Sequence, residues 1–389
     1  MATPLRIVQV NAVYDSSAAN PESLLDRFRT LTGLGHALHA NGAFVATVQR
    51  FNSAARFTRE DVNYSFVADP EPAWLPARSS SPAVVAAVAA FHPDIVHVNG
   101  LMFPTLVAEL RRALDPAAAI VVQHHGGAFP SFGWGPVGAW RRAQWRGALR
   151  AVDAVSFTAA EQASVWRGAG VLGSQQVLGI IEASTTMAQV PRDRARAATN
   201  LRGAPLLLWV GRLSPNKDPL TVLDGLDIAL PHLPEARVAM IYQEDTMHAQ
   251  VSARIAKSDV LRDRVTRVGL VPYDQMPAFY SSADVLISGS HDEGSGYAVI
   301  EAMACGAAPV ITDIPPFRAI AGASGRRWPP SDARALASAL LDLCDSGVAA
   351  ARVVAHQRFE RELSWPAIAG RTLHLYQEVA ERRRRAGAV

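Results

Sequence analysis

The chain has 389 residues, a length that indicates two or three domains. It is 49% hydrophobic and 19% charged, which is typical of a globular protein and excludes a disordered chain. The net charge of +3 permits an anionic substrate or an acidic membrane surface without requiring either, and we expect no nucleic-acid partner. No apolar run approaches the roughly 18 residues that a membrane-spanning helix needs.

The N-terminal residues enter a strand-like pattern at once, without the basic region and apolar core of a secretory leader. The two cysteines, Cys305 and Cys344, are too few to form a metal cluster and are expected to be reduced. We therefore expect a cytoplasmic protein, and association with a membrane surface is compatible with its charge.

Short β-branched runs alternate with longer helical patterns in the first half of the chain. Strands are predicted over residues 5–14, 43–51, 94–100, 118–127 and 152–159. Between the first two, leucines repeat at helical spacing from Leu24 to Leu38, and Gly42 supplies the end of that helix.

The polar, arginine-rich segment 187–204 predicts a linker, after which the alternation resumes. Strands are predicted over residues 205–213, 236–243, 264–271, 283–290 and 308–313. Such alternation is typical of parallel sheets covered by helices on both faces. We expect an α/β protein of two doubly wound, Rossmann-like domains facing across a cleft, with ligands beyond the carboxyl ends of the strands. The expected boundaries are 1–186 for the N-terminal domain, 187–204 for the linker, 205–363 for the C-terminal domain and 364–389 for a final helix.

Two carboxylates flank a glycine-rich turn after the predicted strand 283–290. Glu293 precedes the turn of residues 294–296, and a helix is predicted over residues 297–305. Glycine lets the backbone approach a ligand, and the start of a helix favours an anion. Glu301 follows one helical turn later, so both carboxylates can accept hydroxyl groups in one crevice. The pattern fits a nucleotide diphosphate sugar, although a turn that merely needs glycine and a glutamate favoured by the helix dipole would look the same.

The loop of residues 211–218 is a second candidate anion site. Arg212 contributes a guanidinium fork and Lys217 an ammonium group, and together they can neutralise a departing diphosphate. Asp218 is predicted to cap the next helix, with Pro219 in its first turn. Two solvated loop cations are the alternative interpretation.

Three stretches resemble the retaining GT-B glycosyltransferases of family 4. "VGRLSPNKDP" (210–219) matches the family's G-R-L-x-x-x-K loop, "EGSGYAVIE" (293–301) its E-x7-E signature, and "SWPAIAGRTLHLYQEV" (364–379) its C-terminal helix. The resemblance covers about residues 205–380 and is weaker before them. It implies two facing Rossmann-like domains, with the last helix crossing back toward the first. It also implies transfer of a hexosyl group with retention from a UDP- or GDP-sugar, without an obligatory metal or other cofactor.

The resemblance also implies roles for individual residues. Glu293 would contact the hydroxyls of the donor sugar, Glu301 would hold the ribose, and Arg212 with Lys217 would hold the diphosphate. Donor binding would further involve Gly294, Ser295, Gly296 and Tyr297 at the phosphate or sugar, and Gly269, Leu270 and Val271 beside the nucleobase. The family's G-D-G-like turn is replaced here by "IYQEDTM" (241–247), which leaves the nucleobase open.

His125 matches the family's histidine near the reacting centre and would act with Glu293, Arg212 and Lys217; a satisfied core histidine is the alternative. His124 competes for this role, because alternation along a strand turns the two side chains in opposite directions. The family's glycine-rich loop after the first strand is replaced by "NAVYDSSAANPESLL", in which Asp15 and Ser16, with His124, are candidates for binding the acceptor.

The acceptor class stays open between a small molecule, a saccharide and a lipid-linked compound. Residues 138–155 carry Trp140, Trp145 and several arginines. They predict either a helix that packs its apolar side on the sheet, or one that rests on an anionic membrane and reaches a lipid acceptor. The rival functions are a sugar-nucleotide epimerase or hydrolase on the same fold, and a non-catalytic sugar-nucleotide-binding protein.

Overall fold

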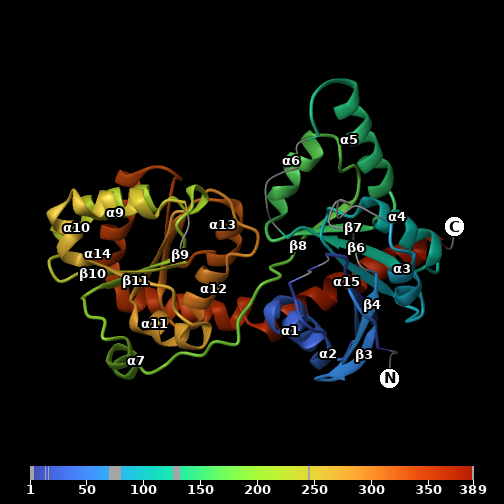
Figure 1. The fold of residues 1–389 in the computed structure, drawn as a ribbon, viewed down its shortest axis with the longest axis horizontal. Coiled ribbons are helices and arrows are strands. Elements are labelled where there is room, and N and C mark those ends of the chain that lie inside the picture. Colours follow the sequence, from blue (N-terminus) through green and yellow to red (C-terminus); the bar gives the residue numbers. More distant parts are fainter. Residues whose placement is uncertain are drawn as a thin grey trace. The chain divides into compact units, whose positions relative to one another are not determined.

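The computed structural model describes residues 4–387 except for 14, 16, 70–79, 126–131 and 244–245. The chain divides into two compact units, Met1–Glu182 with Trp365–Val389, and Ala183–Ser364. In Figure 1 the C-terminal helix α15 (Trp365–Gly387, red) lies with the blue and teal elements of the first unit. Each unit has its own apolar core around a β-sheet.

The first unit is built on an eight-stranded sheet. In spatial order its strands are β3 (Ala55–Arg59), β4 (Val62–Ala68), β2 (Phe44–Phe51), β1 (Arg6–Asn11), β5 (Ile95–Asn99), β6 (Ala119–Gln123), β7 (Ala154–Phe157) and β8 (Gln176–Gly179). All neighbours pair in parallel except β3, which is antiparallel to β4. The five strands predicted for this half are confirmed, and their buried valine and isoleucine runs reflect helices on both faces.

The hairpin of β3 and β4 was not predicted, so the expectation of a wholly parallel sheet was wrong at this edge. Its turn places Glu60 at φ 50° and Asp61 at φ 61°, in the left-handed region that two-residue hairpin turns require. Charged residues fill these positions in place of glycine or asparagine. The sequence therefore lacked the usual hairpin signal.

Seven helices accompany this sheet among the described residues: α1 (Pro21–Arg27), α2 (Arg29–Ala40), α3 (Pro82–Ala89), α4 (Pro104–Ala113), α5 (Gly135–Leu149), α6 (Ala163–Gly168) and α15. The predicted helix between the first two strands is divided at Phe28, whose φ of −103° and ψ of 62° are not helical. Asn20 caps α1 by accepting a hydrogen bond from the Ser23 amide at 2.8 Å.

Helix α15 packs on α2 in the first unit. A Cβ atom added at Gly33 would lie 2.4 Å from the Trp365 ring, so the absence of a side chain there permits this close approach. Tyr376 of α15 is fully buried and its hydroxyl contacts the His97 ring of β5. The last helix is thus part of the first unit's core.

The second unit has a six-stranded parallel sheet. Its spatial order is β11 (Val265–Gly269), β10 (Arg237–Gln243), β9 (Leu206–Arg212), β12 (Val285–Ser288), β13 (Ala308–Thr312) and β14 (Arg326–Trp328). The chain builds outward from β9 in one direction and then resumes at β12 on its other side. The boundary between β9 and β12 is therefore a topological switch point, where ligands of such sheets bind.

The helices of this unit are α7 (Arg192–Thr199), α8 (Pro219–Ala229), α9 (His248–Ala256), α10 (Asp259–Arg264), α11 (Met276–Ser282), α12 (Tyr297–Ala304), α13 (Pro315–Ala321) and α14 (Ala333–Arg358). Helix α7 lies inside the segment 187–204 and packs on α11. It is anchored through Arg196, whose guanidinium bonds the Asp284 carboxylate at 3.1 Å. The arginines that indicated a solvated linker thus make structural contacts within the second unit.

Candidate functional site

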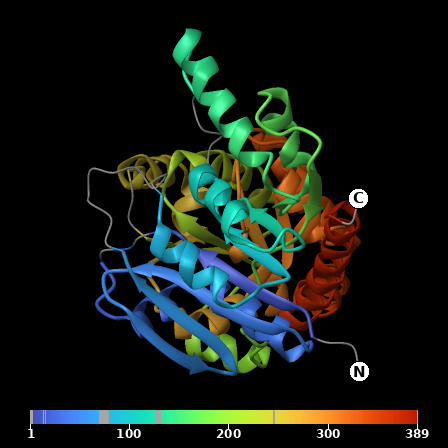
Figure 2. The same cartoon turned by 90° about the vertical axis from the view of Figure 1, so that its right-hand side faces the viewer.

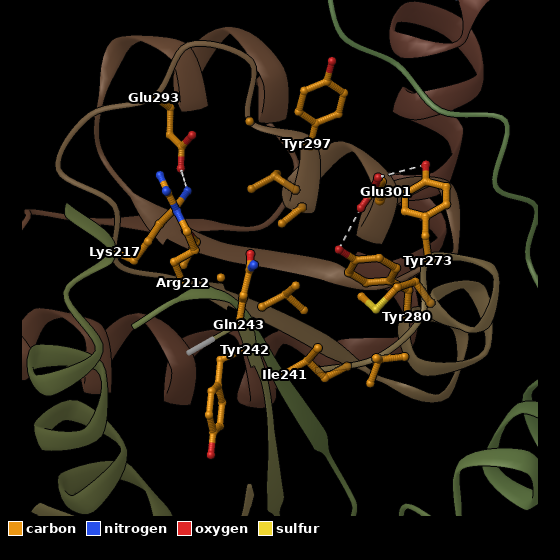
Figure 3. Close-up of a pocket in the computed structure, with 18 of the residues that line it drawn as sticks. Arg212, Lys217, Ile241, Tyr242, Gln243, Tyr273, Tyr280, Glu293, Tyr297 and Glu301 are labelled. Atoms are coloured by element: carbon orange, nitrogen blue, oxygen red, sulfur yellow. Dashed lines mark hydrogen bonds and ion pairs between the residues drawn. The ribbon is translucent and has the colours of Figure 1, made fainter. Parts of the chain in front are cut away.

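A pocket of about 380 Å³ opens at the switch point of the second sheet (Figure 3). Its volume falls in the range of small-molecule sites. Its lining includes Arg212, Lys217, Glu293, Tyr297 and Glu301. Two sequence-predicted loops and the start of α12 therefore meet at one cavity, and they do so within the second unit.

One end of the pocket carries the charged groups. The Lys217 ammonium is paired with the Glu293 carboxylate, which also accepts a hydrogen bond from the Ser290 hydroxyl at 2.7 Å. Both charged side chains are largely removed from solvent, with 24% and 13% exposed. Because water screens such a pair only partly, it orients both side chains strongly.

Asn216 ties the two loops together and was not singled out from the sequence. Its side-chain amide donates to the Asp292 carbonyl at 3.0 Å and its side-chain oxygen accepts from the Asp292 amide at 3.1 Å. The His291 amide donates to the Asn216 carbonyl at 2.9 Å. Lys217 and Glu293 are therefore held by neighbouring backbone as well as by their charges. The only sequence feature that could have pointed to Asn216 is its position directly before Lys217.

Arg212 ends β9 and is exposed at the pocket wall, where Figure 3 shows it next to Lys217. Asp218 follows Lys217 in the left-handed conformation, with φ 41°, and caps α8 by accepting from the Thr221 amide at 3.2 Å. The predicted cap is confirmed. Helix α8 therefore begins two residues after Lys217, which lines the pocket.

The turn before α12 depends on Gly296. This residue has φ 64°, and an added Cβ would lie 2.5 Å from Ile320. Gly296 is the N-cap residue of α12 and has no side chain with which to cap the helix. Gly296 and Tyr297 line the pocket. Gly294 and Ser295 belong to the same turn but are not among the residues that line the pocket. The helix ends at Ala304, one residue before its predicted end, and Gly306 follows at φ 81°, in the left-handed region that often ends a helix.

Glu301 lies at the opposite end of the pocket, 7% exposed. It accepts hydrogen bonds from the Tyr273 hydroxyl at 3.3 Å and the Tyr280 hydroxyl at 2.9 Å. Burial, and then the charge of Glu301, raise the pKa of Tyr280 well above its usual value, so this phenol keeps its proton. A carboxylate offers only acceptor positions, which is the chemistry that hydroxyl donors need. The tyrosines were not identified from the sequence.

The remaining wall is apolar. Leu270 and Val271 line it, and the Leu270 side chain is 76% exposed. Gly269, the last residue of β11, is not among the residues that line the pocket. Gln243, at the end of β10, also faces the pocket (Figure 3). Glu244 and Asp245, which replace the family's glycine-rich turn, lie outside the described residues.

The first unit holds a separate polar cluster around His125. Its Nδ1 lies 2.5 Å from Glu182 Oε2, and its Nε2 lies 2.9 Å from Asn99 Oδ1. Asn99 turns its amide nitrogen to Asn11 Oδ1 at 2.5 Å, so its oxygen is the atom that faces His125. Both ring nitrogens of His125 thus face acceptors, which fits the doubly protonated, charged ring.

The electrostatics of this cluster agree with that assignment. Burial disfavours the charged ring of His125, but the charge and hydrogen bond of Glu182 outweigh it and raise the pKa. His97, which also contacts Asn99 Oδ1 at 2.9 Å, has its pKa lowered to about 4, first by burial and then by the charge on His125. The surroundings therefore favour the charged form of the His125 ring and the neutral form of the His97 ring.

The other acceptor candidates have different surroundings. His124 packs against Phe157 and Trp166, with ring centroids 5.2 and 5.5 Å away, and burial lowers its pKa to about 4. Asp15 accepts from the Ser17 hydroxyl at 2.6 Å and pairs with Arg27 at 2.9 Å. Ser16 lies outside the described residues.

Within the described part of the chain, no three histidine, cysteine, aspartate or glutamate side chains are placed to hold a metal ion. None of the described helices is both long and apolar enough to cross a membrane.

Two family profiles match the chain in separate halves. Residues 29–173 match the profile described as Glycosyltransferase Family 4, and residues 204–346 match Glycosyl transferases group 1. The chain belongs to glycosyltransferase family 4. The family's E-x7-E residues in this chain are Glu293 and Glu301, at opposite ends of the pocket.

Among curated relatives of this family 4 chain, a GDP-mannose:cellobiosyl-diphosphopolyprenol alpha-mannosyltransferase of Xanthomonas campestris is 28% identical, covering 63% of this chain and 62% of the relative. A D-inositol 3-phosphate glycosyltransferase of Thermobispora bispora is 27% identical, covering 49% and 47%. The aligned region thus spans less than two thirds of either relative.

Solved structures establish the GT-B fold of this family 4 member. Sucrose-phosphate synthase from Thermosynechococcus elongatus matches with a TM-score of 0.68 at 21% identity, covering 96% of this chain and 99% of that one. Anabaena HepE in complex with UDP matches with a TM-score of 0.63 at 15% identity, covering 96% and 100%. Identities this low support the fold alone.

Replacing Glu182 with glutamine is expected to lower the pKa of His125, because the attraction of the carboxylate is lost while burial remains. The measurement is a pH titration of the His125 ring by NMR. Glu161→Gln, an exposed change in the same unit, is the control and should leave the titration unaltered. Identical His125 titrations in the two variants would refute the assignment.

The stability of the first unit should fall as the pH decreases from about 6.5 to about 4. In this window the unfolded chain protonates His97 and His124, whereas the folded unit holds their pKa values near 4. His124→Phe keeps the aromatic packing and removes one of the two groups, so the fall should become shallower in urea denaturation. His374→Gln, whose side chain is 72% exposed, is the control. An unchanged slope in His124→Phe would contradict the expectation.

Proposed function

We propose that the chain transfers a sugar from a nucleotide diphosphate sugar to an acceptor hydroxyl with retention at the anomeric carbon. The supporting observation is the pocket itself, with two cations at one end and Glu301 at the other, either side of the start of α12. Cations suit a diphosphate, and an acceptor-only carboxylate suits the hydroxyls of a ribose. The GDP-mannose in the name of the Xanthomonas relative and the UDP bound to HepE support a GDP- or UDP-sugar donor.

In the proposed reaction the acceptor oxygen approaches the anomeric carbon on the face from which the nucleoside diphosphate leaves. As the bond from that carbon to the phosphate oxygen breaks, the phosphate gains charge and takes the acceptor's proton. Arg212 and Lys217 stabilise the developing charge. Glu293 orients the hydroxyls of the donor sugar and, through its ion pair, the Lys217 ammonium.

His125 would orient the sugar or the acceptor as a hydrogen-bonded cation. A ring with protons on both nitrogens cannot accept a further proton, so we assign it no role as a general base. The acceptor is a small molecule, a saccharide or a lipid-linked compound, and we place the reaction in the cytoplasm. A thermal-shift screen of nucleotide sugars, followed by product analysis with and without acceptors, tests this function. Donor binding without transfer to any acceptor would refute it.

Replacing Lys217 with alanine should weaken the binding of UDP or GDP and lower turnover by about a hundredfold or more. The variant loses an ammonium and also leaves the Glu293 carboxylate uncompensated near the phosphates. Calorimetry and initial rates provide the measurement. Lys257→Ala is a matched control, since it removes the chain's only other lysine at an exposed position beyond α9. Equal behaviour of the two variants would disprove the role of Lys217.

Replacing Glu293 with glutamine should reduce transfer by about tenfold or more while leaving UDP or GDP binding intact or tighter. The change breaks the ion pair and frees the Lys217 ammonium for the phosphates. Asp292→Asn, the exposed neighbouring carboxylate, is the control for loss of one negative charge. Proportional losses of binding and transfer in Glu293→Gln would show that Glu293 acts on the nucleotide rather than on the sugar.

A further inference from the structure

Helix α5 of the first unit presents large apolar side chains to solvent. Trp134, just before the helix, is 99% exposed, and Val137 and Trp140 are each 60% exposed. Figures 1 and 2 both show α5 extending away from the sheet of the first unit. Exposed tryptophans grouped on one element are unusual on a protein surface and indicate an interaction site.

The exposed face is distinct from the face that holds α5 in place. Gly138, Trp145 and Leu149 are buried, and Trp145 packs against Phe132 and Trp166 with centroids 5.5 and 6.0 Å away. The helix thus packs its Trp145 side inward, as one of the two sequence interpretations expected. At 100° per residue, Trp140 lies nearly opposite Trp145, so the helix is apolar on two sides.

The exposed face has a mostly apolar centre with cationic borders. Around Trp140 lie Ala139, Ala143, Gln144 and Gly147, all exposed. Arg141 lies on one border and Arg150 on the other by helical geometry, while Arg146, on the same side as Arg150, donates a hydrogen bond to the Gly170 carbonyl. Residues 132–150 contain four arginines and no aspartate or glutamate. The charge of this surface is therefore uniformly positive.

We propose that this face of α5 docks on an anionic lipid bilayer, with Trp134 and Trp140 at the level of the headgroups and the bordering arginines on the lipid phosphates. Tryptophan suits that depth because its ring is apolar and its N–H is polar. Arginines around an apolar stripe are typical of helices that lie in a membrane interface. A protein partner would need pockets for these bulky anchors and a complementary charge pattern, whereas an anionic bilayer requires only exposed apolar side chains beside charges of this one sign.

The proposal goes beyond sugar transfer and does not depend on it, since docking requires neither donor nor acceptor. Its test is co-sedimentation of the full chain with vesicles of phosphatidylcholine alone or mixed with phosphatidylglycerol, together with tryptophan fluorescence. Binding is expected only with phosphatidylglycerol, with a blue shift of the emission, and should weaken as the salt concentration rises. The double variant Trp134→Ser/Trp140→Ser should lose about tenfold or more in vesicle affinity.

Arg141→Glu/Arg150→Glu should lose binding to a similar extent. The matched controls are Val353→Ser, a 57% exposed apolar residue of α14, and Arg202→Glu, an exposed arginine of the second unit; both should bind as the unaltered chain does. Thermal shifts with UDP and GDP report separately on the nucleotide pocket in every variant. No binding to phosphatidylglycerol vesicles, equal binding by the α5 variants, or self-association that the tryptophan substitutions abolish would overturn the proposal.

Discussion

The ion pair between Lys217 and Glu293, reinforced by the hydrogen bonds of Asn216, fixes one end of the pocket in the second unit. It joins the loops that leave β9 and β12, two strands that are adjacent in space but separated in the chain by the strands β10 and β11 and the helices α8 to α11. Without a ligand, the carboxylate neutralises the ammonium. A bound diphosphate would compete for that ammonium, so the same contact that preorganises the empty pocket would also set its preference between phosphate and sugar groups.

The first unit uses a comparable arrangement at its own switch point. Asn11 and Asn99 end the adjacent strands β1 and β5, and their side chains are bonded to each other. Asn99 also places its oxygen toward both His97 and His125, while Glu182 faces the second nitrogen of His125. A network of fixed donors and acceptors thus sets the charge of each ring. In both units, polar side chains at or just after the ends of two neighbouring strands orient a cationic side chain. This side chain is Lys217 in the second unit and His125 in the first.

Many of the strands and helices, and the loop before α12, were predictable from local patterns in the sequence. Alternating β-branched runs and helical repeats identified the central strands of both sheets, because most of the side chains buried on these strands are apolar. The glycine and carboxylate spacing identified the loop before α12. The hairpin of β3 and β4 was missed because Glu60 and Asp61 occupy a turn that usually takes glycine or asparagine. Helix α7 was missed because its arginines resembled a solvated segment.

The sequence by itself determined which groups could hold a diphosphate and hydroxyls, since that follows from the chemistry of Arg212, Lys217, Glu293 and Glu301. Only the tertiary structure decided what surrounds them. Tyr273 and Tyr280 reach Glu301, and Glu182 reaches His125, across separations of 21 to 57 positions along the chain. Such contacts depend on strand order and helix packing, which bring distant residues together without leaving a local pattern in the sequence.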